Sequence, residues 1–164
     1  MPFSQPGFSA FNVRHDTVFW VLTKVYNSVT LGADLKASLL PIRILIVDDN
    51  PALRRGIRAC IENSTDWEIC GEAEDGQAAV EMVLQLKPHL VILDLSMPVM
   101  NGLDAARRIS EIAPETHMIL FTMLDCNDLL KATAKAVGIK HVFSKSQGFG
   151  DHVLATLRSL LLPA

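Results

Sequence analysis

Five side chains suited to metal and phosphate chemistry follow apolar segments of this sequence. One apolar run ends in two adjacent carboxylates, Asp48 and Asp49, and another ends in Asp94. A third ends in Thr122, and a fourth leads into Lys145. Adjacent carboxylates repel each other and are costly to desolvate, so the acidic pair needs a compensating charge.

Three carboxylates form a site of hard oxygen ligands, which Mg²⁺ prefers. This ion takes one or two carboxylates directly and completes its coordination with waters and phosphate oxygens. A cation between Asp48, Asp49 and Asp94 would let them tolerate one another. Asp94 could then attack phosphorus and form an aspartyl phosphate, while Lys145 and the Thr122 hydroxyl hold the transferred oxygens. The residue types therefore predict Mg²⁺-dependent phosphoryl acceptance.

The segments that must bring these side chains together alternate regularly after Pro41. The expected strands are residues 42–47, 67–73, 90–93, 118–122 and 141–143. The expected helices are residues 52–62, 76–86, 103–112, 127–136 and 151–161. This alternation predicts an α/β fold, a doubly wound (βα)5 parallel sheet with helices on both faces. Function in such sheets lies at the carboxyl ends of the strands, where all five side chains are expected.

Composition sets limits on the class of protein. Hydrophobic residues make up 49% of the 164 residues and charged residues 20%, which favours one packed domain, assigned to residues 42–164. Residues 1–41 are expected to be a flexible extension or the result of a mis-assigned start, with a docking segment as the alternative. The net charge of -3 argues weakly against non-specific nucleic-acid binding. Cys60, Cys70 and Cys126 are odd in number and have no CxxC spacing, which favours reduced thiols in a cytoplasmic protein. No apolar run approaches the ~18 residues of a membrane span.

At the residues of the acidic site the chain resembles the receiver domain of bacterial two-component response regulators. The matching pieces are "ILIVDDNPALRRGI", "VILDLSMPVMNGLDAARRI", "ILFTM" and "VFSKS", and the resemblance covers residues 42–162. An Asp followed by MPxMxG is the most specific of these patterns. The resemblance implies a flavodoxin-like sheet with strand order 2-1-3-4-5.

The same resemblance assigns roles to individual residues. Asp94 would be the phospho-acceptor, Thr122 the switch hydroxyl and Lys145 the lysine that pairs with the phosphoryl group. Mg²⁺ would be bound directly by Asp49 and Asp94 and largely through water by Asp48. The backbone carbonyl of Ser96 would be the remaining protein ligand.

Three positions depart from the family pattern. Val142 stands where the family often has an aromatic switch residue, and strand alternation should point the adjacent Phe143 to the other face. Met123 stands where a small residue is preferred, and we hypothesise that it restricts access to the phospho-acceptor. Ser146 after the lysine resembles receivers that usually precede a helix-turn-helix output domain.

The expected function is that of a stand-alone receiver without an output domain. A histidine kinase or phosphotransfer protein would phosphorylate Asp94, and the chain would be no enzyme beyond promoting its own phosphorylation and dephosphorylation. The face formed by the fourth helix, fifth strand and fifth helix would contact a downstream protein, and a homodimer is an open option. Lys131, Lys135 and Lys140 are candidates for that face, although solvation alone also explains them. No direct contact with nucleic acid or membrane is expected.

Other functions fit less well or stay open. A haloacid-dehalogenase-type phosphatase needs a second aspartate where this chain has Ser96, no GxxxxGK[ST] motif exists, and the Asp48–Asp49 pair would repel a flavin phosphate. A truncated DNA-binding transcriptional response regulator and a phosphorylation-independent binding module remain alternatives.

Overall fold

Two apolar strands that are buried on both sides form the centre of the sheet. They are β1 (Arg43–Val47) and β3 (Leu90–Leu93), which pair in parallel. Continuous apolar sequence of strand length is typical of parallel strands covered on both faces. The structure is a computed structural model that describes residues 41–162, and the predictions for residues 1–40 lie outside this range.

Three further strands complete the sheet, and helices alternate with all five strands. The strands are β2 (Glu68–Ala73), β4 (His117–Thr122) and β5 (His141–Ser144). The helices are α3 (Pro51–Ser64), α4 (Gly76–Leu86), α5 (Gly102–Ile112), α6 (Asp128–Ala136) and α7 (Asp151–Leu161), with a short 3-10 helix, η1 (Lys145–Gln147). The strand order is β2-β1-β3-β4-β5, and every pairing is parallel. The predicted fold class and strand order are confirmed.

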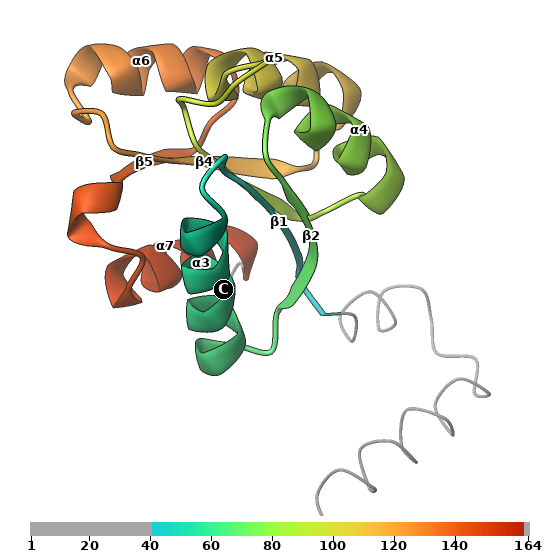
Figure 1. Ribbon diagram of the computed structural model, residues 1–164, viewed down its shortest axis with the longest axis vertical. Coiled ribbons are helices and arrows are strands. Elements are labelled where there is room, and N and C mark those ends of the chain that lie inside the picture. The colour runs from blue at the N-terminus through green and yellow to red at the C-terminus, as the bar shows by residue number, and fades with distance from the viewer. Residues whose placement is uncertain (1–40, 163–164) are drawn as a thin grey trace, which may run out of the picture. The chain divides into compact units, whose positions relative to one another are not determined.

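Helices cover both faces of the sheet (Figure 1). On one face α4, α5 and α6 enclose a core that includes Leu45, Val91 and Leu120. On the other face α3 and α7 enclose a core that includes Ile46 and Phe121. The alternating sides of each strand thus contribute to two separate cores, which fixes the face that each side chain occupies.

Side-chain caps decide where helices α3, α4, α5 and α6 begin. Asn50, Asp75, Asn101 and Asn127 each precede a helix and accept a hydrogen bond from a backbone N–H of its first turn. Asn127, predicted as the first helical residue, is instead the cap of α6. Such caps satisfy N–H groups that have no partner within the helix. They therefore fix the short loops at the carboxyl edge of the sheet.

Among residues 41–162, no helix combines the length and the apolar character that crossing a bilayer requires.

Candidate functional site

Two of the predicted acidic residues extend adjacent central strands. Asp48 follows β1 and donates its backbone N–H to the carbonyl of Ala73 at 3.1 Å. Asp94 follows β3 and donates its N–H to the carbonyl of Val47 at 2.8 Å. Both side chains are buried, since Asp48 is 2% exposed and Asp94 5% exposed. The ladder of the sheet therefore places two carboxylates side by side in a largely desolvated position.

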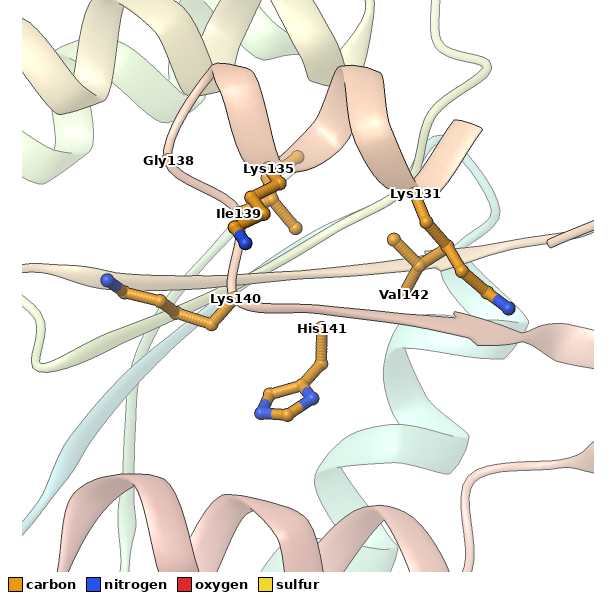
Figure 2. A pocket seen from close by; sticks show the side chains of 7 residues that line it. All are labelled: Lys131, Lys135, Gly138, Ile139, Lys140, His141 and Val142. Carbon is orange, nitrogen blue, oxygen red and sulfur yellow. The ribbon is translucent and has the colours of Figure 1, made fainter. Parts of the chain in front are cut away.

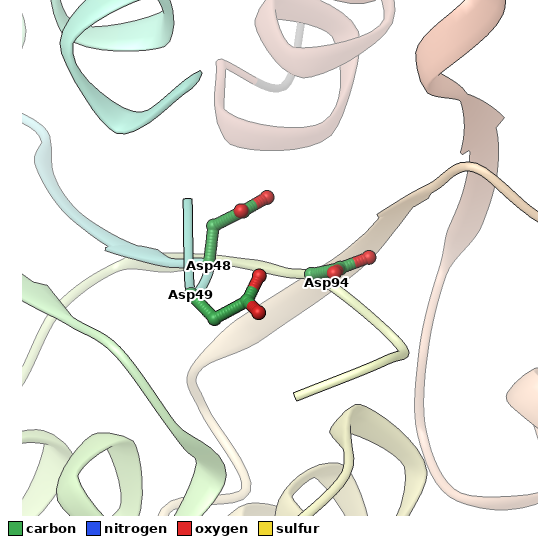
Figure 3. A group of neighbouring side chains, drawn as sticks. All are labelled: Asp48, Asp49 and Asp94. Atoms are coloured by element: carbon green, nitrogen blue, oxygen red, sulfur yellow. The ribbon is translucent and has the colours of Figure 1, made fainter. Parts of the chain in front are cut away.

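The third carboxylate, Asp49, joins them (Figure 3). One carboxylate oxygen from each of Asp48, Asp49 and Asp94 lies within 4.8 Å of the others. Asp49 is exposed, so the cluster opens to solvent on its side. Three carboxylate oxygens at this spacing match what Mg²⁺ requires, which is a few hard ligands and room for water.

Lys145 reaches the cluster from the end of β5, the edge strand of the sheet. Its Nζ lies 2.6 Å from Oδ2 of Asp48 and 3.0 Å from Oδ2 of Asp94, and its side chain is 8% exposed. It begins η1 directly after β5, which β4 separates from β3. One ammonium against three carboxylates leaves two negative charges, which a divalent cation would neutralise. The residues present therefore fit such an ion.

The pKa of Asp94 also fits a cation bound in this cluster. Burial raises the pKa of its carboxyl above the ordinary value for aspartate, although the hydrogen bond and charge of Lys145 oppose this. The neighbouring Asp48 raises it further, and the backbone N–H of Leu95, which donates to Oδ1 of Asp94 at 2.7 Å, lowers it. A second positive charge in the cluster would favour the ionised, nucleophilic form of Asp94.

The structure puts the two remaining predicted residues at the same edge. Thr122 ends β4, is 1% exposed, and its Oγ1 accepts a hydrogen bond from the N–H of Leu124 at 3.3 Å. Ser96 lies two residues after Asp94 in an exposed loop. All six predicted site residues are thus found at the carboxyl ends of the strands.

The loop after Asp94 folds back tightly. Gly102 starts α5 and donates its N–H to the carbonyl of Leu95 at 3.0 Å. A Cβ on Gly102 would lie 2.1 Å from the carbonyl oxygen of Asp94, closer than atoms can approach. Between them Val99 adopts the left-handed region with φ 63°, which is rare for a β-branched residue. The glycine of MPxMxG therefore allows a helix start to pack directly on the backbone of Asp94.

The structure shows where the residues that depart from the family pattern lie. Val142 is half-buried against the core under α4–α6, whereas Phe143 packs against the core under α3 and α7, so the predicted alternation is confirmed. Val142 leaves no aromatic ring at the usual switch position. Met123 is 70% exposed in the loop after β4. Its influence on access to Asp94 stays a prediction.

One residue at the site, Arg54, was not among those predicted from the sequence. Arg54, at the start of α3, donates from Nη1 to the backbone carbonyl of Asp48 at 2.5 Å and from Nε to Glu72 at 3.1 Å. Its position in the sequence, about one helical turn after the acidic pair, could have indicated this contact. A long basic side chain there can turn back to the strand end.

Comparison with known proteins agrees with this geometry. Residues 44–156 match the sequence model of the response regulator receiver domain. The chain is 47% identical over 96 residues to a protein-glutamate methylesterase/protein-glutamine glutaminase of Pyrococcus abyssi, covering 58% of this chain and 26% of the relative. It is 36% identical over 83 residues to the nitrate/nitrite response regulator protein NarL of Escherichia coli, covering 51% of this chain and 38% of that protein. The chain thus spans less than two fifths of these relatives.

Solved structures show the same likeness. The response regulator domain of Thermotoga maritima CheB is 28% identical with a TM-score of 0.62, covering 75% of this chain and 92% of that one. The isolated REC domain of RcsB from Salmonella enterica serovar Typhimurium is 27% identical with a TM-score of 0.66, covering 74% and 88%. With the family match over residues 44–156, the chain belongs to the response regulator receiver domain family.

Proposed function

We propose that this chain is a phosphorylation switch in which Asp94 accepts a phosphoryl group from a phosphohistidine. The donor would be a sensor histidine kinase or a phosphotransfer protein. A carboxylate oxygen of Asp94 forms the new bond to phosphorus as the bond from phosphorus to the histidine nitrogen breaks, and that nitrogen takes up a proton. The observation that carries this proposal is the buried cluster in which Lys145 contacts both Asp48 and Asp94 beside a third carboxylate.

Mg²⁺ would be held by Asp49 and Asp94 directly, by Asp48 largely through water, and by the backbone carbonyl of Ser96. Bound there, it would shield the incoming phosphoryl group from the negative charge of the cluster. The protein's part is to keep Asp94 desolvated and aimed. The Leu95 N–H on its Oδ1 and the hydrogen bond from the Asp94 N–H to the Val47 carbonyl fix that aim.

Lys145 and Thr122 would respond to the new charge. The Lys145 ammonium, now shared between two carboxylates, can follow the phosphoryl oxygens because it is a flexible point charge. The Thr122 hydroxyl can donate to a phosphoryl oxygen while its oxygen is held near the N–H of Leu124. Movement of Thr122 would therefore reach the loop between β4 and α6.

The output would be a contact between proteins through the face of α6, β5 and α7. A groove of about 550 Å³ lies beside β5, and Figure 2 shows the side chains of Lys131, Lys135, Lys140 and His141 around it. Lys131 also pairs with Asp128 at 3.8 Å, so part of this charge is already balanced. A downstream protein, or a second copy of the chain, could use this face.

The first test is intact mass spectrometry after incubation with a small phosphodonor and Mg²⁺. We expect one added phosphoryl group on the wild-type chain, no addition with EDTA, and none on Asp94→Asn. A chain that stays unmodified by small donors is then given a charged phosphohistidine protein. Failure with both donors would replace this proposal with a phosphorylation-independent binding module.

A second candidate is the receiver part of a longer DNA-binding regulator, which the similarity to NarL favours. An antibody against residues 41–162 can distinguish the two in the native cells. A band at the size of the 164-residue chain supports the stand-alone receiver, and a larger band supports the longer regulator.

A further inference from the structure

The side chain of Arg54 joins the acidic edge of the sheet to the neighbouring strand β2. Its guanidinium donates from Nη1 to the backbone carbonyl of Asp48 at 2.5 Å and from Nε to Oε2 of Glu72 at 3.1 Å. The side chain is 16% exposed, so it is well shielded from competing water. A guanidinium is a rigid planar fork of donors, so it fixes the directions of two acceptors more strictly than a freely rotating ammonium does.

The carbonyl that Arg54 contacts belongs to the peptide bond between Asp48 and Asp49. A peptide unit is planar, so a hydrogen bond to its oxygen fixes the plane from which Asp49 continues. The carboxylate of Asp48 has its own partners, the N–H of Asn50 at 2.9 Å and Lys145 at 2.6 Å. In the part of the chain that the structure describes, the Asp49 carboxylate has no hydrogen bond or ion pair. The point from which this side chain starts is therefore set by its backbone, which Arg54 holds.

The charge of Arg54 is balanced where it sits. Glu72 accepts hydrogen bonds from Arg54 and also from Nε of Arg58 at 2.8 Å. Arg58 pairs in addition with Glu62 at 3.0 Å, so two carboxylates balance the two guanidinium groups. An unbalanced guanidinium beside a cation site would repel the cation. The pairing with Glu72 lets Arg54 orient the acidic pair at little electrostatic cost to that site.

We propose that Arg54 is a positioning residue that aims Asp49 at the divalent cation through the Asp48 carbonyl. This inference rests on the proposed function, because it assumes that the acidic cluster binds Mg²⁺. Residues that orient a metal ligand without touching the metal typically change metal affinity about 10- to 100-fold when they are removed.

The test compares Mg²⁺ binding to the full chain by isothermal titration calorimetry for wild type, Arg54→Ala and Arg58→Ala. Arg58 is the matched control, because it lies on the same helix and pairs with Glu72 and Glu62, and its described contacts do not include the Asp48 carbonyl. We expect Arg54→Ala to weaken Mg²⁺ binding about tenfold and Arg58→Ala to change it less than about twofold. Urea midpoints in EDTA report how much each variant loses in stability alone.

The outcomes separate the inference from the function on which it rests. If wild type binds no Mg²⁺, the proposed function and this inference both fail. If wild type binds Mg²⁺ and both variants retain its affinity, or both lose it equally, only the role of Arg54 is refuted. Should Arg54→Ala not fold, Arg54→Lys replaces it, since an ammonium keeps the charge but lacks the fork. Weaker binding in that variant supports the role, and wild-type affinity overturns it.

Discussion

At the scale of single residues, Lys145 makes the acidic cluster tolerable. Its ammonium lies between two buried carboxylates, at 2.6 Å and 3.0 Å. Removing one partner from a buried charge pair leaves the other charges uncompensated, which costs far more than losing an exposed pair. The cluster therefore depends on Lys145 whenever no metal ion is bound.

Replacing this lysine should destabilise the fold in a metal-dependent way. We expect Lys145→Met to lower the free energy of unfolding by about 3 kcal/mol in EDTA. The loss should shrink when Mg²⁺ is added, because the ion supplies the missing positive charge. Urea denaturation with and without Mg²⁺ measures both values. The control is Lys131→Met, which removes an exposed ion pair with Asp128 and should leave the free energy of unfolding nearly unchanged. Equal losses in the two variants would contradict the prediction.

Met123 provides a kinetic prediction at the same scale. If its side chain limits access to Asp94, Met123→Ala should speed phosphorylation by small donors and loss of the phosphoryl group, because a shorter side chain leaves more room for the donor and for water. Time-resolved intact mass gives both rates. Leu129→Ala removes another exposed apolar side chain, 77% exposed in α6, and should leave both rates unchanged. Unchanged rates in Met123→Ala would end the hypothesis.

At the scale of elements, Glu72 links β2 to α3. Burial raises the pKa of Glu72, but hydrogen bonds from Arg58 and Arg54 outweigh this effect and bring the pKa below the ordinary value for glutamate. A carboxyl whose pKa is lower in the folded chain stabilises the fold above its unfolded pKa, and this stabilisation is lost as the pH falls through the folded pKa.

The pH dependence of stability should therefore change in Glu72→Gln. At pH 7 we expect this variant to be less stable than wild type by about 1 kcal/mol, because two arginines lose their shared partner. The difference should diminish as the pH falls below about 4, where the unfolded glutamate becomes protonated first, and it should be lost as the pH falls through the lower pKa of the folded chain. Urea titrations at several pH values test this. A difference that stays constant down to pH 3 would show that charge is not its cause.

The start of α5 gives a second prediction about elements. Because a Cβ at Gly102 would lie 2.1 Å from the Asp94 carbonyl oxygen, Gly102→Ala must push the helix away from the strand end. We expect a loss of about 3 kcal/mol in the free energy of unfolding. Gly56→Ala is the control, since a Cβ at that position in α3 meets no atom within 4 Å and should stabilise the helix by about 0.5–1 kcal/mol. Thermal unfolding of both variants tests this prediction. A Gly102→Ala variant that is as stable as wild type would refute the close approach.

At the scale of the whole molecule, the site couples metal binding to folding. Asp48, Asp94 and Lys145 come from three strands or strand ends of one sheet, so the cluster exists only in the folded chain. A ligand that binds only the folded state stabilises it by RT ln(1 + [L]/Kd). Mg²⁺ binding should therefore appear as a gain in stability.

We expect Mg²⁺ at a hundred times its Kd to raise the free energy of unfolding of the wild-type chain by about 2.7 kcal/mol. Asp49→Asn should lose most of this gain, because it removes one of the three carboxylates of the cluster. In EDTA the same variant should be at least as stable as wild type, because the exposed Asp49 side chain has no described partner to lose and its removal takes a negative charge away from Asp48 and Asp94. Urea midpoints across a Mg²⁺ series check both statements. An equal gain in wild type and Asp49→Asn would place the bound ion elsewhere.

Much of this molecule could be predicted from local sequence. Alternating apolar runs and helical periods were enough for the (βα)5 architecture, because burial on two faces demands that pattern. Strand bounds differ from the prediction by at most one residue at either end, and residues 90–93 agree fully. Polar residues directly after apolar strands also predicted where the site lies, since parallel strands end at a common edge.

Tertiary structure alone decided the contacts within the site. The sequence has no local signal that the Lys145 ammonium bridges Asp48 and Asp94, because that contact depends on how β5 is positioned two strands away from β3. The role of Gly102 against the Asp94 carbonyl and the hydrogen bond from Arg54 to the Asp48 carbonyl likewise depend on helix placement. Hydrophobic pattern determines which elements form and which faces they bury. Hydrogen-bond distances of 2.5–3.0 Å between these polar atoms arise only when all the elements pack together.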